Sequence, residues 1–260
     1  MSSYALADAM TMARRDFKHT QRYPMMLIST VVAPAFLLVM FVLIFGHAMT
    51  GALIGTGSAH YVDYITPAIL IQTIAFSAQT TAIMVNTDMT EGVIARFRTM
   101  AISRPAVMTG TVAGSAVRTL LAIGMLLAVA LGLGYRPHGS PLGWLAALGL
   151  VTLLTLGFMW LSVGFGLNAK TVAGASSSVV ALEFLPFISG AFVPTGSMPS
   201  AVRWIAANEP FNPIIGSVRG LLGGTPTGHQ GWTALAWCLG FLLLGYVWAR
   251  RLYDKEPGGR

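Results

Sequence analysis

Long runs of apolar residues dominate this sequence and restrict the kind of fold it can adopt. The six runs lie near 24–46, 62–86, 106–134, 142–167, 172–195 and 231–250. A helix needs about 20 apolar residues to cross the roughly 30 Å hydrocarbon core of a bilayer. Only 10% of the residues are charged, whereas soluble domains carry about 25%. The sequence therefore predicts an all-α polytopic membrane protein with six transmembrane helices, formed as a single domain over residues 1–260.

The basic residues lie at the ends of the apolar runs, and their distribution predicts an orientation. If the N-terminus is cytoplasmic, twelve of the sixteen Lys and Arg residues fall in cytoplasmic segments, three fall outside and Arg118 lies within a span. This bias follows the positive-inside rule. We therefore expect a multi-pass protein of the cell membrane with both termini in the cytoplasm. Because the basic residues form no single patch, nucleic-acid binding is not expected despite a formal net charge of +7.

Two segments outside the spans also carry a pattern. Residues 4–22 place Leu6, Met10 and Phe17 at helical spacing with charges on other faces, which predicts an amphipathic helix in the inner interface. Residues 196–230 are too polar and too rich in Pro and Gly to cross the membrane. We expect this second segment to form short re-entrant or extracellular helices between the fifth and sixth spans, because irregular backbone is not tolerated in lipid.

Motifs that would indicate an enzyme are weak. The stretch from Gly164 to Thr171 matches a phosphate-binding loop except that Ala169 replaces the second glycine, and it ends an apolar run instead of following a strand. The five His and nine acidic residues are scattered, with no metal-ligand or acid–base spacing. The single cysteine, Cys238, has no partner for an internal disulfide. We therefore expect no catalytic, metal or cofactor-binding site in this chain.

The predicted inner loop 88–104 is longer and more patterned than a simple connection requires. Val93, Ile94 and Phe97 fall on one face of a short helix, and Glu91, with two nearby arginines, lies around them. Such an amphipathic cytoplasmic helix can press into a groove on a partner protein. The alternative is a helix that rests on lipid headgroups.

At these residues the sequence resembles the type-2 family of ATP-binding-cassette export permeases, and more narrowly its daunorubicin-resistance group. The family's inner loop carries an acidic residue, a glycine, basic residues and a Ser-Arg pair. The matching residues here are Glu91, Gly92, Arg96, Arg98, Ser103 and Arg104. Further similar positions are Tyr23 and Pro24, residues 187–194, Met198 and Pro199, residues 208–213, and residues 219–221. Glu209 departs from the simpler Asn-Pro turn that is common at its position.

The resemblance implies a permease subunit that dimerises, as a homodimer or heterodimer, and binds two copies of a separate cytoplasmic ATP-binding cassette subunit. Mg-ATP would be bound by that partner, and hydrophobic or amphipathic molecules such as drugs, antibiotics or lipids would move outward. The 4–22 helix would lie in the interface, and 88–104 would be the coupling helix. The implied docking residues are Glu91, Gly92, Val93, Arg96, Phe97, Arg98 and Arg104. The implied markers of the extracellular segment are Pro194, Pro199, Glu209, Pro210 and Arg219.

Two ionisable residues lie deep in predicted spans. About a dozen residues from Thr171, at 1.5 Å each, place Glu183 about 18 Å deep, near the bilayer midplane, and Arg118 reaches a similar depth from Ala106. An ionisable group at that depth costs about 2.5–3.5 kcal/mol, so both should face protein or water. We expect an Arg118–Glu183 ion pair. The alternative is that Glu183 lines the substrate path and meets cationic substrates.

Other functions remain open at this stage. The chain could export a lipid-linked glycan, or act as a proton-coupled secondary carrier that uses Glu183. A lipid transferase would need a carboxylate or His cluster, which the sequence lacks. Small residues at Gly164, Gly166 and 174–178 permit close helix approach, for which tight packing within the chain is the simplest explanation and a dimer seam the other.

Overall fold

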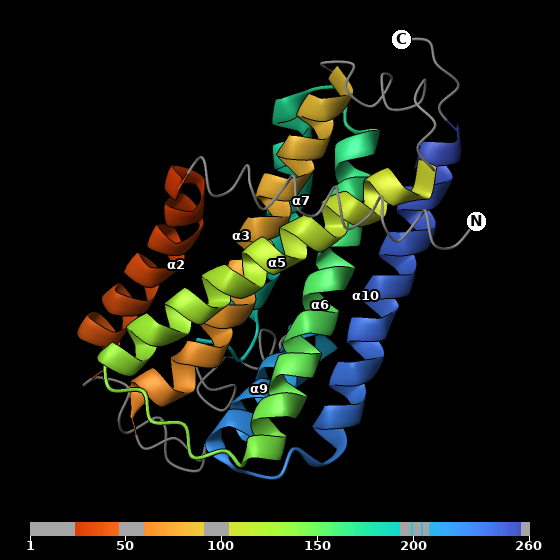
Figure 1. Cartoon of the computed structure of the whole chain (residues 1–260). Helices are drawn as coiled ribbons and strands as arrows, with labels where there is room; N and C mark the ends of the chain where they lie inside the picture. The colour runs from red at the N-terminus through yellow and green to blue at the C-terminus, as the bar shows by residue number, and fades with distance from the viewer. Residues whose placement is uncertain are drawn as a thin grey trace.

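The computed structural model describes residues 24–46, 60–90, 104–192, 199, 204 and 208–255, and helices joined by short loops make up this part of the chain (Figure 1). Its seven helices are α2 (Pro24–Phe45), α3 (Tyr61–Thr90), α5 (Arg104–Gly132), α6 (Pro141–Asn168), α7 (Val172–Ile188), α9 (Phe211–Gly223) and α10 (Gly228–Lys255). The all-α fold expected from the apolar runs is confirmed for these residues.

Four of the helices are long and apolar enough to cross a membrane, namely α3, α5, α6 and α10. Two shorter apolar helical stretches, Thr30–Phe45 of α2 and Val172–Phe187 of α7, accompany them. Every predicted span therefore corresponds to a helix, and four of the six meet the length and hydropathy expected of a span. The count of six transmembrane helices stays a prediction.

The bundle has two ends, which we name after a residue at each. At the Arg136 end, α3, α6 and α10 begin, and α5 and α7 finish; at the Lys170 end, the directions reverse (Figure 1). The phenol of Tyr61 donates a hydrogen bond to the backbone oxygen of Phe192 at 3.0 Å, which joins the start of α3 to the segment after α7. The ring of Phe41 lies 5.2 Å from that of Phe192, so α2 also finishes at the Arg136 end.

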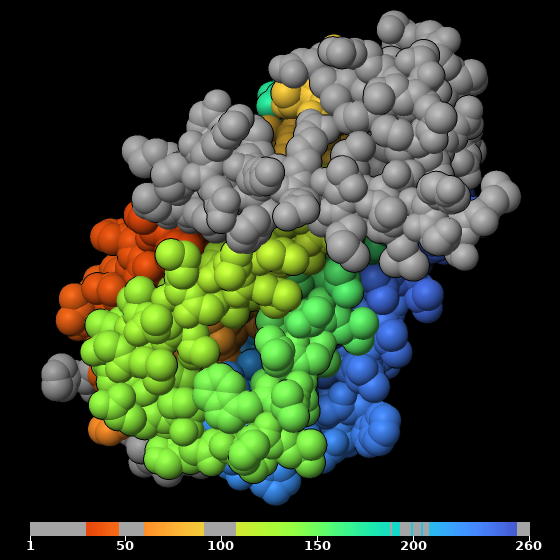
Figure 2. All heavy atoms as spheres, in the orientation of Figure 1, coloured from red at the N-terminus to blue at the C-terminus, as the bar shows by residue number. Residues whose placement is uncertain are grey.

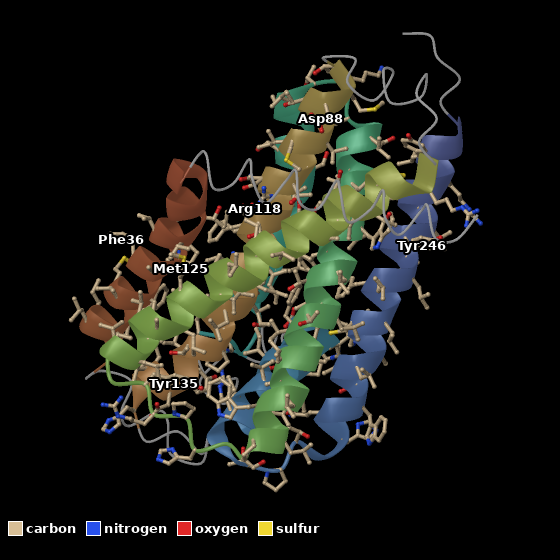
Figure 3. The ribbon with its side chains drawn as sticks, viewed as in Figure 1. Phe36, Asp88, Arg118, Met125, Tyr135 and Tyr246 are labelled. Atoms are coloured by element: carbon tan, nitrogen blue, oxygen red, sulfur yellow. The ribbon has the colours of Figure 1, made fainter. Side chains whose placement is uncertain are left out.

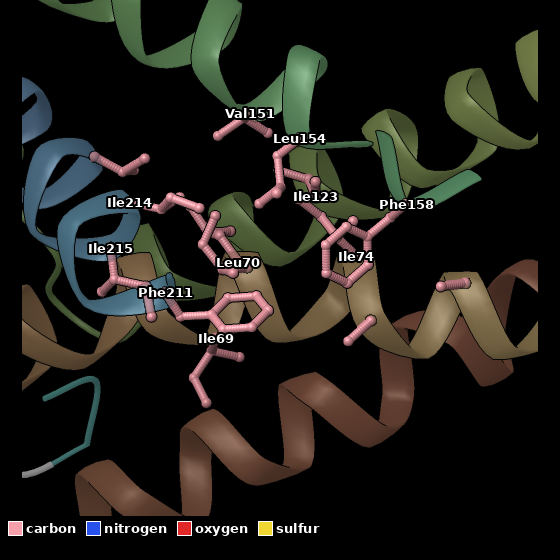
Figure 4. Packing of buried hydrophobic residues seen from close by; sticks show 14 of the residues in the cluster. Ile69, Leu70, Ile74, Ile123, Val151, Leu154, Phe158, Phe211, Ile214 and Ile215 are labelled. Carbon is pink, nitrogen blue, oxygen red and sulfur yellow. The ribbon is translucent and has the colours of Figure 1, made fainter. Parts of the chain in front are cut away.

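Helix α3 lies at the centre and packs against α2, α5, α6, α7 and α9. Figure 4 shows its apolar residues beside those of α5, α6 and α9. The labelled core residues are Ile69, Leu70 and Ile74 of α3, Ile123 of α5, Val151, Leu154 and Phe158 of α6, and Phe211, Ile214 and Ile215 of α9. Buried threonines of α3, such as Thr73, donate to the carbonyl four residues earlier, which satisfies the hydroxyl inside an apolar core.

Glycines allow α6 and α10 to pack closely. A Cβ on Gly157 would lie 2.9 Å from the backbone nitrogen of Leu242, and one on Gly164 would lie 2.5 Å from the Trp248 ring. A Cβ on Gly166 would lie 2.7 Å from the carbonyl oxygen of Ala82 in α3. Tight packing within the chain is thus confirmed for Gly164 and Gly166, since small residues let helix backbones approach in membranes.

Large apolar side chains cover the outside of the bundle. Phe36 of α2 is 68% exposed and Met125 of α5 is 52% exposed, and Figure 3 shows both pointing away from the core. Figure 2 shows the face that carries α2, α5, α6 and α10, with a hollow between α5 and α6 in which part of α3 is visible. An apolar exterior over a partly polar interior is the arrangement that a bilayer favours, because hydrocarbon replaces water around the helices.

Candidate functional site

The contact between α3 and α7 holds the buried carboxyl group of Glu183. Glu183 is 9% exposed, and its Oε1 has no hydrogen-bond partner. Gln72 of α3 is fully buried, and its Nε2 donates to the backbone oxygen of Glu183 at 2.9 Å. The Oε1 of Gln72 also has no partner. Gln72 and Glu183 are thus in direct contact, and the side chain of each has a buried oxygen without a donor. Buried polar atoms normally have a hydrogen-bond partner.

Arg118 of α5 has a different environment. It is 4% exposed, and Figure 3 shows it on the side of α5 that faces α3. Its Nη2 lies 3.4 Å from Oγ1 of Thr81 and 3.3 Å from Oγ of Ser115. Hydroxyl groups on two helices thus accept from the guanidinium, which offsets part of the cost of burying a cation.

The packing of the helices does not support the expected ion pair between Arg118 and Glu183. Oε1 of Glu183 has no hydrogen-bond partner, and the contacts of Arg118 described above go to hydroxyl groups. Helix α5 packs against α2, α3 and α6, whereas α7 packs against α3, α6 and α9. Counting residues along each span placed the two side chains at one depth, but depth says nothing about which neighbour a helix faces. Helix α3 separates them.

A second polar cluster lies at the Arg136 end around Arg219 of α9. Its Nε donates to the backbone oxygen of Tyr64 at 3.1 Å, and Nη2 lies 3.4 Å from the backbone oxygen of Ala191. The guanidinium carbon lies 3.6 Å above the centroid of the Tyr64 ring. Burial lowers the pKa of Arg219, and the neighbouring Tyr64 opposes that shift. One cation therefore ties α9 to α3 and to the segment after α7.

Asp63 holds the adjoining loop at the same end. Its Oδ1 accepts from the backbone nitrogen of Arg136 at 3.1 Å, and its Oδ2 accepts from that of His60 at 3.3 Å. An acidic residue in the first turn of a helix is also favoured by the helix dipole. Burial, and to a smaller extent the Asp63 carboxylate, raises the pKa of Tyr135 to about 12. The Tyr135 phenol therefore stays protonated and neutral in this cluster.

Glu209 precedes α9, with Pro210 as the N-cap residue of that helix. Burial raises the pKa of Glu209 to about 7, and the backbone amides of Phe211 and Asn212 act in the opposite direction. The two amides lie close to the carboxyl group, but neither carboxylate oxygen lies in a well-formed hydrogen bond. Glu209 is thus a second buried carboxyl group without a well-formed hydrogen bond.

The remaining predicted site residues have mixed outcomes. The expectation of a short helix within 196–230 is confirmed by α9, and Pro199 is exposed. Pro194, the 4–22 helix and the docking residues from Glu91 to Arg98 lie outside the described residues. Arg104 is the first residue of α5. The loop that contains the predicted docking residues joins the end of α3 to the start of α5, so both of its attachment points lie at the Lys170 end (Figure 1).

Two features of these sites were missed from the sequence. Gln72 interrupts an apolar run, which is the kind of signal that identified Glu183, but glutamine carries no charge and was passed over. The cluster of Asp63, Tyr64, Tyr135 and Arg219 draws on three segments far apart in the chain. No spacing in the sequence relates these residues, so only the packing of α9 against α3 brings them together.

Known proteins support a transport role. The profile of the ABC-2 type transporter family matches residues 8–222. The chain is also 30% identical over 216 residues to the daunorubicin resistance ABC transporter permease protein DrrB1 of Streptomyces coeruleorubidus. That alignment covers 82% of this chain and 73% of the Streptomyces protein. The family match includes the 91–103 loop, Glu183 and most of α9.

Proposed function

This chain belongs to the ABC-2 type transporter family, and from that premise we propose that it exports hydrophobic or amphipathic molecules from the cytoplasm or the inner leaflet. Permeases of this family are transport subunits without catalysis or a cofactor of their own, and ATP is bound by partner subunits. The proposal adds an outward direction, two copies of the ATPase and a second copy of the permease. A drug-like substrate is supported by the similarity to the Streptomyces daunorubicin resistance permease.

The observation that carries this proposal is the position of the two helix ends that residues 91–103 connect. The end of α3, the central helix, and the start of α5 both lie at the end of the bundle where α2 begins and α10 finishes. A movement of this loop would act directly on α3, which packs against five other helices. In the proposed arrangement the loop is the coupling helix that receives the stroke of the ATPase.

Six transmembrane helices and cytoplasmic termini are part of the proposal. The 22 residues of α2 span about 33 Å and the 17 residues of α7 about 26 Å, at 1.5 Å each. The Lys170 end would then be cytoplasmic, in keeping with the positive-inside rule.

The proposed orientation can be tested with a cysteine at Thr227, in the loop before α10 at the Arg136 end. Cys238 is fully buried, and a Cys238→Ala background removes it as a source of signal. We expect Thr227→Cys to react with an impermeant thiol reagent applied to intact cells. Reaction only after the membrane is opened would reverse the orientation.

The coupling role is tested by replacing Phe97 and Arg98 together with Ala. We expect the protein to insert and purify normally, but to lose the ATPase during co-purification or to lose at least about 90% of ATP-driven export. Arg251→Ala, an exposed residue near the end of α10, is the matched control at the same end and should keep both activities. Normal coupling in the double variant would contradict the assignment. Export driven by a proton gradient without any ATPase would instead favour a secondary carrier.

A further inference from the structure

A buried turn follows α7, and side chains of two other helices hold its backbone. We name residues 189–192, which make up this turn, the strap. The backbone oxygens of Gly190, Ala191 and Phe192 each accept a hydrogen bond from a side chain. The donors, in that order, are the phenol of Tyr64 at 2.5 Å, Nη2 of Arg219 at 3.4 Å and the phenol of Tyr61 at 3.0 Å. Three consecutive carbonyl groups are thus bound by residues of α3 and α9.

Helix α7 has a point of weakness just before the strap. Pro186 lies inside α7, near its end. A proline within a helix has no N–H to bond the carbonyl one turn earlier, so sharp bends of helices commonly occur there. The hydroxyl of Ser189 donates to the backbone oxygen of Pro186 at 2.6 Å and accepts from the backbone nitrogen of Ala191 at 3.0 Å. The strap therefore has hydrogen bonds of its own and can move as a unit when α7 bends at Pro186.

The closed position of the strap has a cost further along the same two helices. Gln72 lies about two helical turns after Tyr64 on α3, and Glu183 lies on α7 before Pro186. Oε1 of Gln72 and Oε1 of Glu183 are buried without a hydrogen-bond partner. Water that entered between α3 and α7 from the Arg136 end would supply donors to both oxygens. The hydrogen bonds to the strap therefore hold together two helices that would gain polar partners on separating.

We propose that the strap closes the Arg136 end of the bundle, and that Tyr61, Tyr64 and Arg219 form the latch that keeps it closed. Release of the three carbonyl groups lets the strap swing about Pro186 and admits water between the ends of α3 and α7. Hydrogen bonds from side chains suit a latch, because each contributes little net stability and breaks without unpacking a helix. The link between this opening and outward transport rests on the export function proposed above, but the latch itself does not.

The test measures how readily a cysteine in the strap reacts. Ala191 is fully buried, so Ala191→Cys in a Cys238→Ala background should react slowly with N-ethylmaleimide while the strap is closed. Tyr61→Phe and Tyr64→Phe each remove one donor and keep the ring. We expect each variant to raise the reaction rate about fivefold, and both together at least about twentyfold, because one hydrogen bond shifts a local opening equilibrium by about that factor. The full-length chain is purified in detergent, and mass spectrometry follows the reaction.

Two controls separate release of the strap from general loosening. Tyr135→Phe makes the same chemical change at a buried residue of the Arg136 end whose phenol is not among the donors to the strap, and it should leave the rate at Ala191→Cys unchanged. The native Cys238 of α10 is also fully buried. In chains that keep Cys238 and lack the strap cysteine, the tyrosine variants of the latch should leave its reaction rate unchanged.

Two results would overturn the latch. The first is a rate at the strap cysteine that does not rise in Tyr61→Phe and Tyr64→Phe. The second is a rise that Tyr135→Phe or the native Cys238 reproduces. If Ala191→Cys does not purify, Ser189→Cys takes its place, since Ser189 is fully buried and the change replaces only one atom.

The link to transport is measured separately, in proteoliposomes that contain the ATPase. Addition of ATP should raise the reaction rate of Ala191→Cys in a chain with an intact latch. Faster reaction in the tyrosine variants, with neither ATP-driven export nor an effect of ATP on the strap, would leave the latch standing and sink the exporter proposal. ATP-driven export, with equally slow reaction in the intact chain and the tyrosine variants, would do the reverse.

Discussion

The buried ionisable groups on the two sides of α3 differ in their hydrogen bonds. On the side of α5, Arg118 donates to hydroxyl groups of Thr81 and Ser115. On the side of α7, Oε1 of Glu183 has no partner, and the adjoining Gln72 adds another unpartnered oxygen. A buried charge with its hydrogen bonds in place stabilises a contact between helices, whereas one without them is a cost unless a ligand supplies the missing donor. The difference indicates a structural role for Arg118, whereas Glu183 keeps a buried oxygen without a hydrogen bond.

The same contrast recurs at the Arg136 end. Arg219 donates to backbone oxygens of α3 and of the segment after α7, while neither carboxylate oxygen of Glu209 accepts a well-formed hydrogen bond. In the described part of the chain, these two arginines join helices, whereas each of these two glutamates keeps a buried oxygen without a well-formed hydrogen bond. Substitution of these arginines and glutamates tests how each contributes to stability.

The largest expected effect is at Arg219. Arg219→Gln removes the stacking on Tyr64 and leaves the backbone oxygens of Tyr64 and Ala191 without this donor. We expect a loss of about 3 kcal/mol in the free energy of unfolding, measured by thermal unfolding of the purified protein. Arg219→Lys should recover less than half, because a single ammonium cannot stack and reach both carbonyls.

Arg251→Gln, at an exposed position of α10, is the control for Arg219 and should change stability by less than about 0.5 kcal/mol. Full recovery by Arg219→Lys would show that charge alone matters at this position.

A smaller effect is expected from Glu209→Gln, with a dependence on pH. The pKa of Glu209 is raised by burial from its ordinary 4.5 to about 7, so the carboxylate disfavours the folded state once it ionises. Its contribution to stability is fully present below pH 4.5 and is lost as the pH rises through about 7. Glu209→Gln should therefore be more stable than wild type by about 1–3 kcal/mol at pH 8.

The difference between Glu209→Gln and wild type should shrink toward zero as the pH is lowered to 4.5. Measuring unfolding of both proteins at several pH values removes the contributions of all other groups, which the two share. A difference that stays constant with pH would show that Glu209 has an ordinary pKa.

The smallest effect is the coupling between Arg118 and Glu183. Because α3 separates the two residues, the effects of Arg118→Gln and Glu183→Gln on stability should add to within about 0.5 kcal/mol in a double-mutant cycle. Arg118→Gln should account for most of the loss, since it breaks bonds to Thr81 and Ser115. A larger coupling, with recovery in the double variant, would restore the ion pair and remove the contrast between the two sides of α3.

The sequence by itself determined the class of this protein. Length and hydropathy are properties of each segment taken alone, so the apolar runs predicted where α2, α3, α5, α6, α7 and α10 lie. The prediction for the fifth span, 172–195, was too long, because α7 ends at Ile188. The Pro and Gly residues between 196 and 230 likewise predicted short helices there, and α9 is such a helix. The family resemblance rested on residues in order along the chain and is confirmed by the match over 8–222. The docking roles of the residues from Glu91 to Arg104 stay predictions.

Only the tertiary structure decided which side chains meet. Residue counting placed Arg118 and Glu183 at one depth, yet α3 lies between their helices, and Gln72 of α3 is the residue that contacts Glu183. The cluster around Arg219 likewise depends on how α9 packs against α3. The physical reason is that the depth of a residue follows from the rise of its own helix, whereas the helix that its side chain faces depends on the rotation of each helix and on its neighbours. Both are set by close packing of side chains from segments far apart in the sequence.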